Sequence, residues 1–286
     1  MAKRYVLVSN PESFCLSDSF IDQFSLLGKG WLHEGRACEI ITKEPINIPS
    51  NLPVDVFEID PLDDNRKKQF LFCDMDSTIL QDETLDKLAE HLPKDIHEKI
   101  VAITEQAMAG ELDFTQALTR RVSYLKGLDA TLFKTLIPNL PFSKGAQTLV
   151  KTMKRHGAFC VLISGGFTHV TAPIAGSLSF DEHHGNNLVT RDNKFTGELS
   201  GKILDGQEKS YIVKRVLNRY KATKENAISV GDGANDVNML EQTAFNFAFH
   251  GKDILKEKAR FQINHTDLTS ILYAQGFKQD EIVWAD

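Results

Sequence analysis

Two aspartates stand two residues apart where a short apolar run of the sequence ends. They are Asp74 and Asp76 in the segment DMDST, and the run QFLFC before them is typical of a buried strand. Because side chains alternate along an extended chain, both carboxylates would point into one site. Such close carboxylates repel each other, and a hard divalent cation such as Mg²⁺ would neutralise them. A solvated pair at a loop or helix cap, or a glycosyltransferase metal site, would show the same DxD, so the motif alone leaves these alternatives open.

A second acidic cluster follows the apolar run NAISV, in the segment GDGANDVNML. Gly231 and Gly233 allow the chain to turn tightly around Asp232. Asp236 lies further along the same turn, and Asn235 can donate or accept hydrogen bonds. A helix N-cap would account for Asn235 or Asp236 but not for an aspartate held between two glycines. The segment therefore predicts a second group of oxygen ligands.

Groups that could hold an anion occur in two further places. The run AFCVLIS ends in Ser-Gly-Gly, where the Ser164 hydroxyl and the Gly165 backbone N–H would face a phosphate at the start of a helix. Lys209 lies near the start of another predicted helix, where the helix dipole favours an acid unless the lysine faces an anion. Each feature is weak alone, because Ser-Gly-Gly is a common turn and most lysines are surface residues. His183 and His184 resemble metal ligands only by type and are expected in a solvated loop.

The elements that would carry these residues are short strands alternating with helices. Strands are expected at residues 69–74, 158–164 and 226–232, with weaker candidates at 245–250 and 260–265. Helical patterns between them predict an α/β fold, in which helices cover both faces of a parallel sheet. Ligands of such sheets bind beyond the carboxyl ends of the strands, where the candidate residues fall.

The chain is expected to have three parts. Residues 1–69 are predicted to form a small α+β module, about two thirds of an ACT-like fold, which ends in a solvated linker. Residues 70–83 and 142–286 are assigned to the α/β core. Residues 84–141 lack strand patterns and are predicted to form a helical insertion above the sheet edge.

Within the module, three strands and one helix are expected. The strands are predicted at residues 3–9, 37–43 and 54–59, and the helix at residues 19–31. Nothing in this part of the sequence carries obvious chemistry.

The composition limits the functions to consider. Lysine and arginine total 33 against 39 acidic residues, and the net charge of −6 argues against non-specific binding to nucleic acid or anionic membranes. The four cysteines are far apart, which is typical of reduced thiols in a cytoplasmic protein. Neither a signal-peptide core nor a run of membrane-spanning length is present in the sequence. We therefore expect a cytoplasmic protein that binds a small molecule, not nucleic acid or a membrane.

Taken together, DMDST, SGG, Lys209 and GDGAND resemble the motifs of the haloacid dehalogenase superfamily, in the same order, and are most similar to those of its phosphoserine phosphatases. The resemblance runs from Phe70 to the C-terminus. It implies a Rossmann-like, three-layer core with a helical cap inserted after the first strand. The long stretch between Asp74 and Ser164 leaves room for such a cap, whereas the shorter stretch between Ser164 and Lys209 leaves no room for a second large one.

The resemblance also implies a Mg²⁺-dependent hydrolysis of O-phosphoserine to serine and phosphate, a step of serine biosynthesis. Asp74 would be the nucleophile that forms an aspartyl-phosphate, and Asp76 would be the general acid and base. Mg²⁺ would be bound by Asp74, the backbone carbonyl of Asp76 and Asp232, with Asp236 in the outer shell.

The same resemblance assigns the substrate contacts. Glu83 matches the residue that binds the substrate ammonium, and Arg121 matches the one that binds its carboxylate. The remaining expected substrate-binding residues hold the phosphoryl group or form an apolar wall, and they are Ser164, Gly165, Lys209, Asn235, Met108 and Phe114.

Two other functions would use the same motifs. One is a phosphotransferase that passes the phosphoryl group to another alcohol such as homoserine. The other is a non-catalytic phospho-amino-acid sensor in which the N-terminal module carries the function. A sensor does not need both Asp74 and Asp76, which favours an enzyme. A homodimer through the N-terminal module is the one assembly that we consider.

Overall fold

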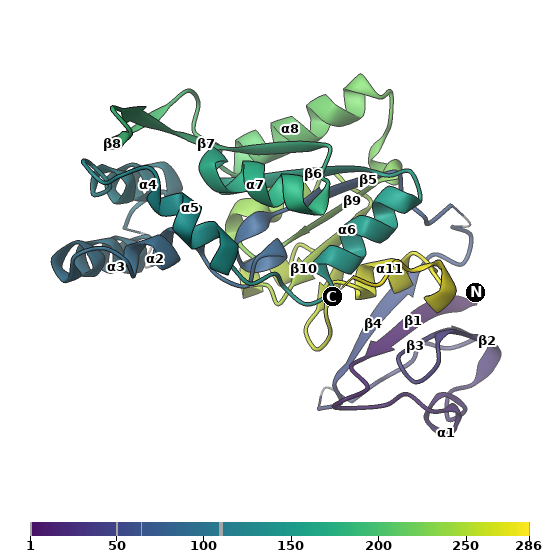
Figure 1. Cartoon of the computed structure of the whole chain (residues 1–286). Helices are drawn as coiled ribbons and strands as arrows, with labels where there is room; N and C mark the ends of the chain where they lie inside the picture. The colour runs from purple at the N-terminus through teal and green to yellow at the C-terminus, as the bar shows by residue number, and fades with distance from the viewer. Residues whose placement is uncertain (1, 50, 64, 109–110, 286) are drawn as a thin grey trace.

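The structure is a computed structural model that describes residues 2–49, 51–63, 65–108 and 111–285 (Figure 1). It contains a central seven-stranded sheet and a separate four-stranded sheet formed by the N-terminal module. A group of helices stands at one end of the central sheet, away from the module. Of the described helices, none has the length and apolarity needed to cross a membrane.

The central sheet confirms the predicted α/β fold. Its strands have the order β11-β10-β9-β5-β6-β7-β8, and all neighbours are parallel except β7 and β8. The strands expected from the sequence are β5 (Phe70–Cys73), β6 (Phe159–Phe167), β9 (Ala227–Gly231), β10 (Phe245–Phe249) and β11 (Phe261–Ile263). Because β5 lies between β6 and β9, the three polar strand endings meet at one edge of the sheet.

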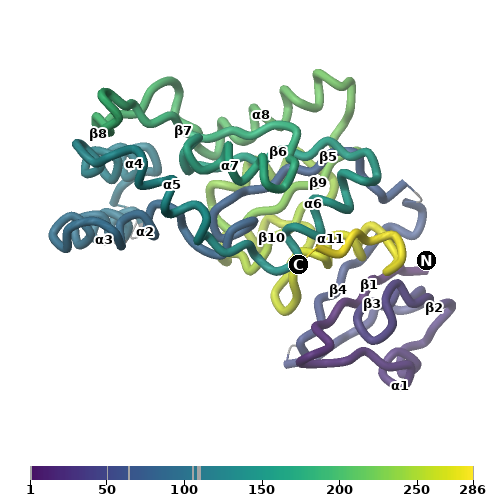
Figure 2. The backbone as a smooth tube through the Cα atoms, viewed as in Figure 1, coloured from purple at the N-terminus to yellow at the C-terminus, as the bar shows by residue number. Residues whose placement is uncertain are grey.

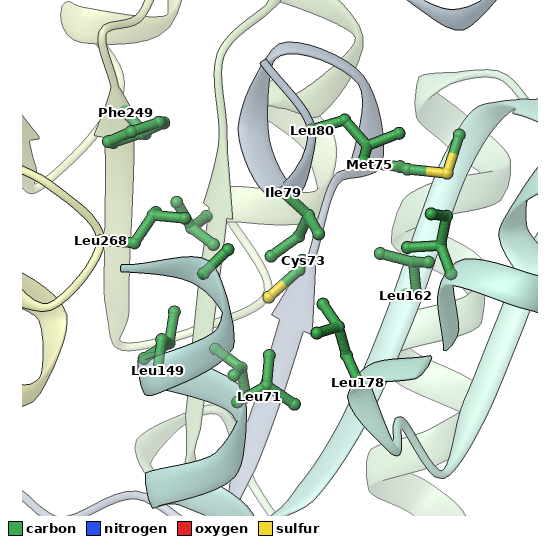
Figure 3. Packing of buried hydrophobic residues seen from close by; sticks show 14 of the residues in the cluster. Leu71, Cys73, Met75, Ile79, Leu80, Leu149, Leu162, Leu178, Phe249 and Leu268 are labelled. Carbon is green, nitrogen blue, oxygen red and sulfur yellow. The ribbon is translucent and has the colours of Figure 1, made fainter. Parts of the chain in front are cut away.

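Two helical layers cover the two faces of this sheet. Phe70 and Phe72 pack in the layer of α8 (Gly206–Arg219), α9 (Val237–Leu240) and α10 (Asp253–Lys256). Leu71 and Cys73 pack in the opposite layer, with α6 (Ala146–Arg155), α7 (Thr168–Leu178) and α11 (Ser270–Ala274) (Figure 3). Alternate residues of β5 therefore serve two cores, which explains why its sequence is apolar throughout.

A hairpin that the sequence analysis missed extends the sheet. It consists of β7 (Glu182–Arg191) and β8 (Lys194–Ser200), joined by Asp192 and Asn193, which both have positive φ as a two-residue hairpin turn requires. The prediction of a solvated loop at His183 and His184 is therefore wrong, because both lie in β7. His183 Nδ1 lies 3.0 Å from Thr171 Oγ1 of α7.

The insertion after β5 contains only helical elements among its described residues. They are α2 (Thr84–Ala89), α3 (Lys94–Met108), α4 (Phe114–Ser123), α5 (Leu132–Leu136) and the short turn η2 (Ile137–Asn139). The chain leaves and returns at one point, where the Gln81 N–H donates to the Pro141 carbonyl at 3.0 Å. The β7–β8 hairpin packs against the insertion beside α4 (Figure 2). The Gly127 N–H of the insertion donates to the Phe195 carbonyl of β8 at 2.8 Å.

The N-terminal module is built on an antiparallel sheet. Its strands lie in the order β2-β3-β1-β4, which are Leu26–His33, Ala37–Thr42, Lys3–Ser9 and Val54–Ile59. The helix predicted at residues 19–31 is wrong, because only Asp18–Ile21 (α1) is helical and Leu26–His33 forms β2. Gly28 and Gly30 disfavour a helix, and pairing with β3 stabilises the strand instead.

The module packs its sheet against the core. In β4, Val54 and Val56 face the module's own apolar cluster, whereas Phe57 and Ile59 belong to the main core cluster. The Phe57 ring lies 5.7 Å from the rings of both Phe247 and Phe261, which are in β10 and β11. The sheet is thus buried on both faces, and one of them is covered by the core.

The predicted linker between the module and the core is also partly buried. Lys68 has little exposure to solvent and donates its backbone N–H to Gln275 Oε1 at 2.9 Å. The prediction that this whole segment is solvated is therefore wrong at its end.

Candidate active site

A pocket lies at the carboxyl ends of β5, β6 and β9, between the sheet and the insertion. It brings together eight of the residues expected from the sequence, which are Asp74, Asp76, Glu83, Phe114, Arg121, Gly165, Asp232 and Asn235. The wall also contains Gly166 of the Ser-Gly-Gly motif and four residues that had no signal in the sequence, which are Leu85, Leu118, Phe167 and Lys252. Met108 ends α3, but its side chain lies outside the described residues.

The turn after β5 positions the first two aspartates. Asp74 remains extended, and its N–H donates to the Val230 carbonyl of β9 at 3.0 Å. The chain then turns tightly through Met75–Ile79, where Ser77 has a positive φ of 56° and Asp76 is again extended. Both carboxylates consequently face the same pocket, although only Asp74 is buried.

Lys209 lies fully buried behind Asp74 and does not line the pocket wall. Its Nζ is 2.5 Å from Asp74 Oδ1 and 2.7 Å from Asp236 Oδ1. Burial favours the neutral amine, but Asp236 and Asp74 outweigh burial and raise the pKa of Lys209 above its ordinary value. The lysine therefore remains charged and holds the carboxylate of Asp74 in one orientation.

The glycine turn after β9 is required by close packing. A Cβ atom on Gly231 would lie 2.4 Å from the Asp236 carboxyl group, so any larger residue would displace this carboxylate. Asp236 Oδ2 accepts the N–H groups of Asp232 at 3.2 Å and Gly233 at 3.1 Å. Asp236 thus fixes the backbone on which Asp232 stands.

Three carboxylates converge in this part of the site. Asp74, Asp232 and Asp236 each place an oxygen within 4.8 Å of the others. Burial and the neighbouring Asp236 raise the pKa of Asp74 well above its ordinary value, and the same two causes raise the pKa of Asp232 to about 6. Lys209 contacts two of the three carboxylates and Lys252 lies near Asp232, so negative charge still exceeds positive charge and the cluster favours a further cation. Carboxylate oxygens are the ligands that Mg²⁺ prefers, and the donor set therefore fits that ion.

Asp76 is held by residues from two different elements. Its Oδ2 accepts the Ser164 hydroxyl at 2.9 Å, and Ser164 Oγ in turn accepts the Gly166 N–H at 2.8 Å. Its Oδ1 accepts the Thr84 N–H at 2.8 Å and also the Thr84 hydroxyl. Thr84 begins the insertion, and it had no signal in the sequence beyond that of a residue at a helix start.

Two charged side chains face the pocket, one from the residue just before the insertion and one from within it. The Glu83 carboxylate reaches solvent, yet desolvation by the surrounding protein, together with Asp76, raises its pKa to about 7. Ser77 Oγ donates to Glu83 Oε1 at 3.1 Å. Arg121 forms an ion pair with Asp86, but its buried Nε finds no hydrogen-bond acceptor among the described residues.

An aromatic contact joins the insertion to the core above the pocket. Phe114 opens α4, and its Cζ would lie 2.8 Å from a Cβ atom on Gly165. The absence of a side chain at Gly165 therefore lets the Phe114 ring approach the backbone in the last part of β6.

Comparisons with known proteins agree with this geometry. The family model of the haloacid dehalogenase-like hydrolases matches residues 71–241. A phosphoserine phosphatase of Methanocaldococcus jannaschii is 35% identical over 207 residues, which cover 72% of this chain and 97% of that protein. The chain belongs to the haloacid dehalogenase-like hydrolases. Within them, it belongs to the phosphoserine phosphatase family.

Some related phosphoserine phosphatases extend well beyond the region that matches this chain. A phosphoserine phosphatase of Archaeoglobus fulgidus is 34% identical over 207 residues, which cover 72% of this chain and 60% of that protein. The chain thus spans less than two thirds of that relative.

Solved structures share the fold. One described as a phospho-aspartyl intermediate analogue of phosphoserine phosphatase has a TM-score of 0.66 at 34% identity, over 72% of this chain and 98% of its own. The unliganded structure of a probable phosphoserine phosphatase from Vibrio cholerae has a TM-score of 0.79 at 28% identity, over 99% of this chain and 90% of its own. The second likeness includes the N-terminal module.

Proposed function

We propose that this protein is a Mg²⁺-dependent phosphatase that hydrolyses O-phosphoserine to serine and phosphate in serine biosynthesis. The observation that carries the proposal is a single pocket in which two differently held aspartates face Glu83, which precedes the insertion, and Arg121 of the insertion. Asp74 is buried against Lys209, whereas Asp76 accepts hydrogen bonds from Ser164 and Thr84. This difference in environment suits two different chemical roles.

Asp74 is the proposed nucleophile. One of its oxygens attacks phosphorus to form an aspartyl-phosphate, and the bond from phosphorus to the serine oxygen breaks. Asp76 donates a proton to that leaving oxygen and later removes a proton from the water that attacks the aspartyl-phosphate. Serine leaves in the first step and inorganic phosphate in the second.

The same geometry supports the proposed metal-binding residues. Asp74, the backbone carbonyl of Asp76 and Asp232 would hold Mg²⁺, which when bound would neutralise charge on the transferring phosphoryl group. Asp236 has both oxygens engaged, by Lys209 and by two backbone N–H groups, which supports its outer-shell assignment.

Residues just before the insertion and within it provide the proposed contacts to the serine portion of the substrate. Glu83 would bind the ammonium, and the unmatched Nε of Arg121 supports a role in binding the carboxylate. The other proposed substrate-binding residues cover the ligand or hold phosphoryl oxygens, and they are Phe114, Met108, Ser164, Gly165, Lys209 and Asn235.

The setting of the enzyme is also proposed. All four cysteines are free, and three are buried, which supports a reducing cytoplasmic environment. The partner would be the small-molecule substrate, with no role for nucleic acid or a membrane. A homodimer through the N-terminal module stays a prediction, which light scattering of the purified chain would test.

A substrate panel tests the proposed function. The purified chain is assayed with Mg²⁺ and with a chelator on phosphoserine, phosphothreonine and p-nitrophenyl phosphate, and serine and phosphate are both quantified. We expect phosphoserine to have the highest kcat/KM and equal yields of the two products. Added homoserine that captures phosphoryl groups would instead support a phosphotransferase, and binding without turnover would support a sensor.

A further inference from the structure

The N-terminal module contacts the loop after β11 through a buried carboxylate. Asp55 lies in β4, with a relative exposure of only 3%. Its Oδ1 accepts the N–H groups of Asn264 at 2.9 Å and His265 at 3.2 Å. Its Oδ2 accepts the Thr266 N–H at 3.0 Å and the Thr266 hydroxyl at 2.5 Å. One side chain of the module therefore fixes three consecutive residues of the loop after β11.

His250, the residue that follows β10, contacts both the end of β11 and this loop. It donates its N–H to the carbonyl of Ile263, the last residue of β11, at 2.8 Å, and its Nε2 lies 3.0 Å from the carbonyl oxygen of Thr266 in the loop. The backbone of His250 has a φ of 44°, a left-handed conformation that is unfavourable for a residue with a side chain. Contacts on both sides of the residue are needed to maintain such a conformation.

The next residues of the same turn contact the aspartate of the proposed metal site. The Lys252 N–H donates to the Asp232 carbonyl oxygen at 2.8 Å. A Cβ atom on Gly251 would lie 3.4 Å from the same oxygen, so the turn also packs closely against it. Asp232 and Lys252 both line the active-site pocket, and both also line a neighbouring cleft with His250 and His265.

We propose that Asp55 is a positioning residue for Asp232. It fixes the loop of residues 264–266, this loop holds His250, and the turn of His250 fixes the backbone of Asp232. The inference rests on the proposed function in one respect, which is that Asp232 binds the metal ion. It gives the N-terminal module a part in metal binding although none of the module's described residues lines the pocket wall.

The test compares Asp55→Asn with a matched control in the full-length chain. Asparagine keeps the shape of the side chain but replaces one accepting oxygen with an NH₂ group, which would face backbone N–H donors. The control is Tyr273→Phe, which removes the hydrogen bond of 2.7 Å between the Tyr273 hydroxyl and His33 of the module. Both changes disturb the contact between module and core, but only the first acts on the loop that leads to Asp232.

Binding of Mg²⁺ is measured by calorimetry without substrate, beside the midpoint of thermal unfolding. Loss of a residue that supports a metal ligand weakens metal binding about 10- to 100-fold, and for a more remote residue we expect about 3- to 10-fold. Tyr273→Phe should bind Mg²⁺ as the wild type does. At saturating Mg²⁺, the KM of Asp55→Asn for phosphoserine should remain near the wild-type value. Unchanged Mg²⁺ binding by Asp55→Asn, or equal weakening in both variants, would overturn the proposal.

A second variant tests the next contact if Asp55→Asn does not fold. His250→Asn tolerates the left-handed backbone, because asparagine adopts it readily, but is too short to reach the Thr266 carbonyl. It should weaken Mg²⁺ binding to a similar degree, and wild-type binding would contradict the inference. A wild-type chain that binds Mg²⁺ but does not hydrolyse phosphoserine would contradict the proposed function and leave this inference intact.

Discussion

Asp74 in the core and Asp55 in the N-terminal module are both buried aspartates, but their surroundings are opposite. Asp74 has Lys209 as its cationic partner, and burial together with nearby carboxylates raises its pKa. Asp55 accepts hydrogen bonds from three backbone N–H groups and a hydroxyl. A carboxylate whose charge is poorly compensated can perform chemistry, whereas one whose charge is fully satisfied holds structure. The predictions below test this contrast.

The largest effect is expected from Asp74→Asn. We expect kcat for phosphoserine to fall more than about 1,000-fold, because the amide cannot form an aspartyl-phosphate. Since burial and Asp236 raise the pKa of Asp74, ionising it reduces stability, and the neutral amide should leave the midpoint of thermal unfolding unchanged or higher without Mg²⁺. Asp55→Asn should lower this midpoint because it leaves buried N–H groups unpaired. The free energy of unfolding should fall by about 1–3 kcal/mol.

Enzyme assays and thermal unfolding of the two variants check this prediction. A strong loss of stability in Asp74→Asn, equal to that in Asp55→Asn, would contradict the contrast. Residual phosphate release near the wild-type rate would remove Asp74 as the nucleophile.

Much of the candidate site was predictable from the sequence because three of its residues come at or near the end of an apolar run. Asp74 and Asp232 follow β5 and β9, Ser164 lies in the last part of β6, and parallel strands bring these ends together at one edge. A pattern of strand followed by polar residue is local, so a single sequence can reveal it. The convergence of the pocket residues then follows from topology.

Other features depend on contacts between distant residues and left no comparable signal. Thr84 accompanies Asp76 only because the insertion begins beside it, and Lys252 reaches the pocket through the turn after β10. In the module, the apolar run from Tyr5 to Val8 predicts a strand but does not by itself identify what covers it. Its lack of alternation indicates burial on both faces, and the second face is covered by the core. The missed β7–β8 hairpin consists mostly of polar residues, so its sequence lacks the apolar run that marks the other strands.

A second prediction tests whether the module and the core share their packing. Phe57→Ala removes a fully buried ring between the two sheets and should reduce the free energy of unfolding by about 3–5 kcal/mol. Val54→Ala, on the opposite face of β4, is the matched control and should reduce it less, by about 1–2 kcal/mol. Denaturant unfolding measures both values. A single cooperative transition is expected, and two separate transitions would show that the module unfolds independently.

A third prediction concerns the role of Arg121 in substrate recognition. Arg121→Ala should lower kcat/KM for phosphoserine about 10- to 100-fold, since a charge-assisted hydrogen bond contributes roughly 1.5–3 kcal/mol. The same change should affect p-nitrophenyl phosphate much less, because that substrate has no carboxylate. Arg120→Ala, at the neighbouring exposed position of α4, is the control and should change neither value. Equal losses on both substrates would contradict the assignment.

The smallest effect is expected in the pH dependence that Glu83 produces. Its pKa is raised to about 7, so the carboxylate that would bind the substrate ammonium is ionised above that pH and protonated below it. We expect kcat/KM for phosphoserine to fall up to about tenfold between pH 8 and pH 6 from this group alone. The substrate phosphate also titrates, with a pKa of about 6, so the comparison requires Glu83→Gln, which retains the titration of the substrate. This variant should have a lower kcat/KM at pH 8 and a weaker dependence on pH below 8. If the wild type and Glu83→Gln show the same dependence of kcat/KM on pH, another group binds the ammonium. Glu83 would then not be an example of a carboxylate whose poorly compensated charge serves function.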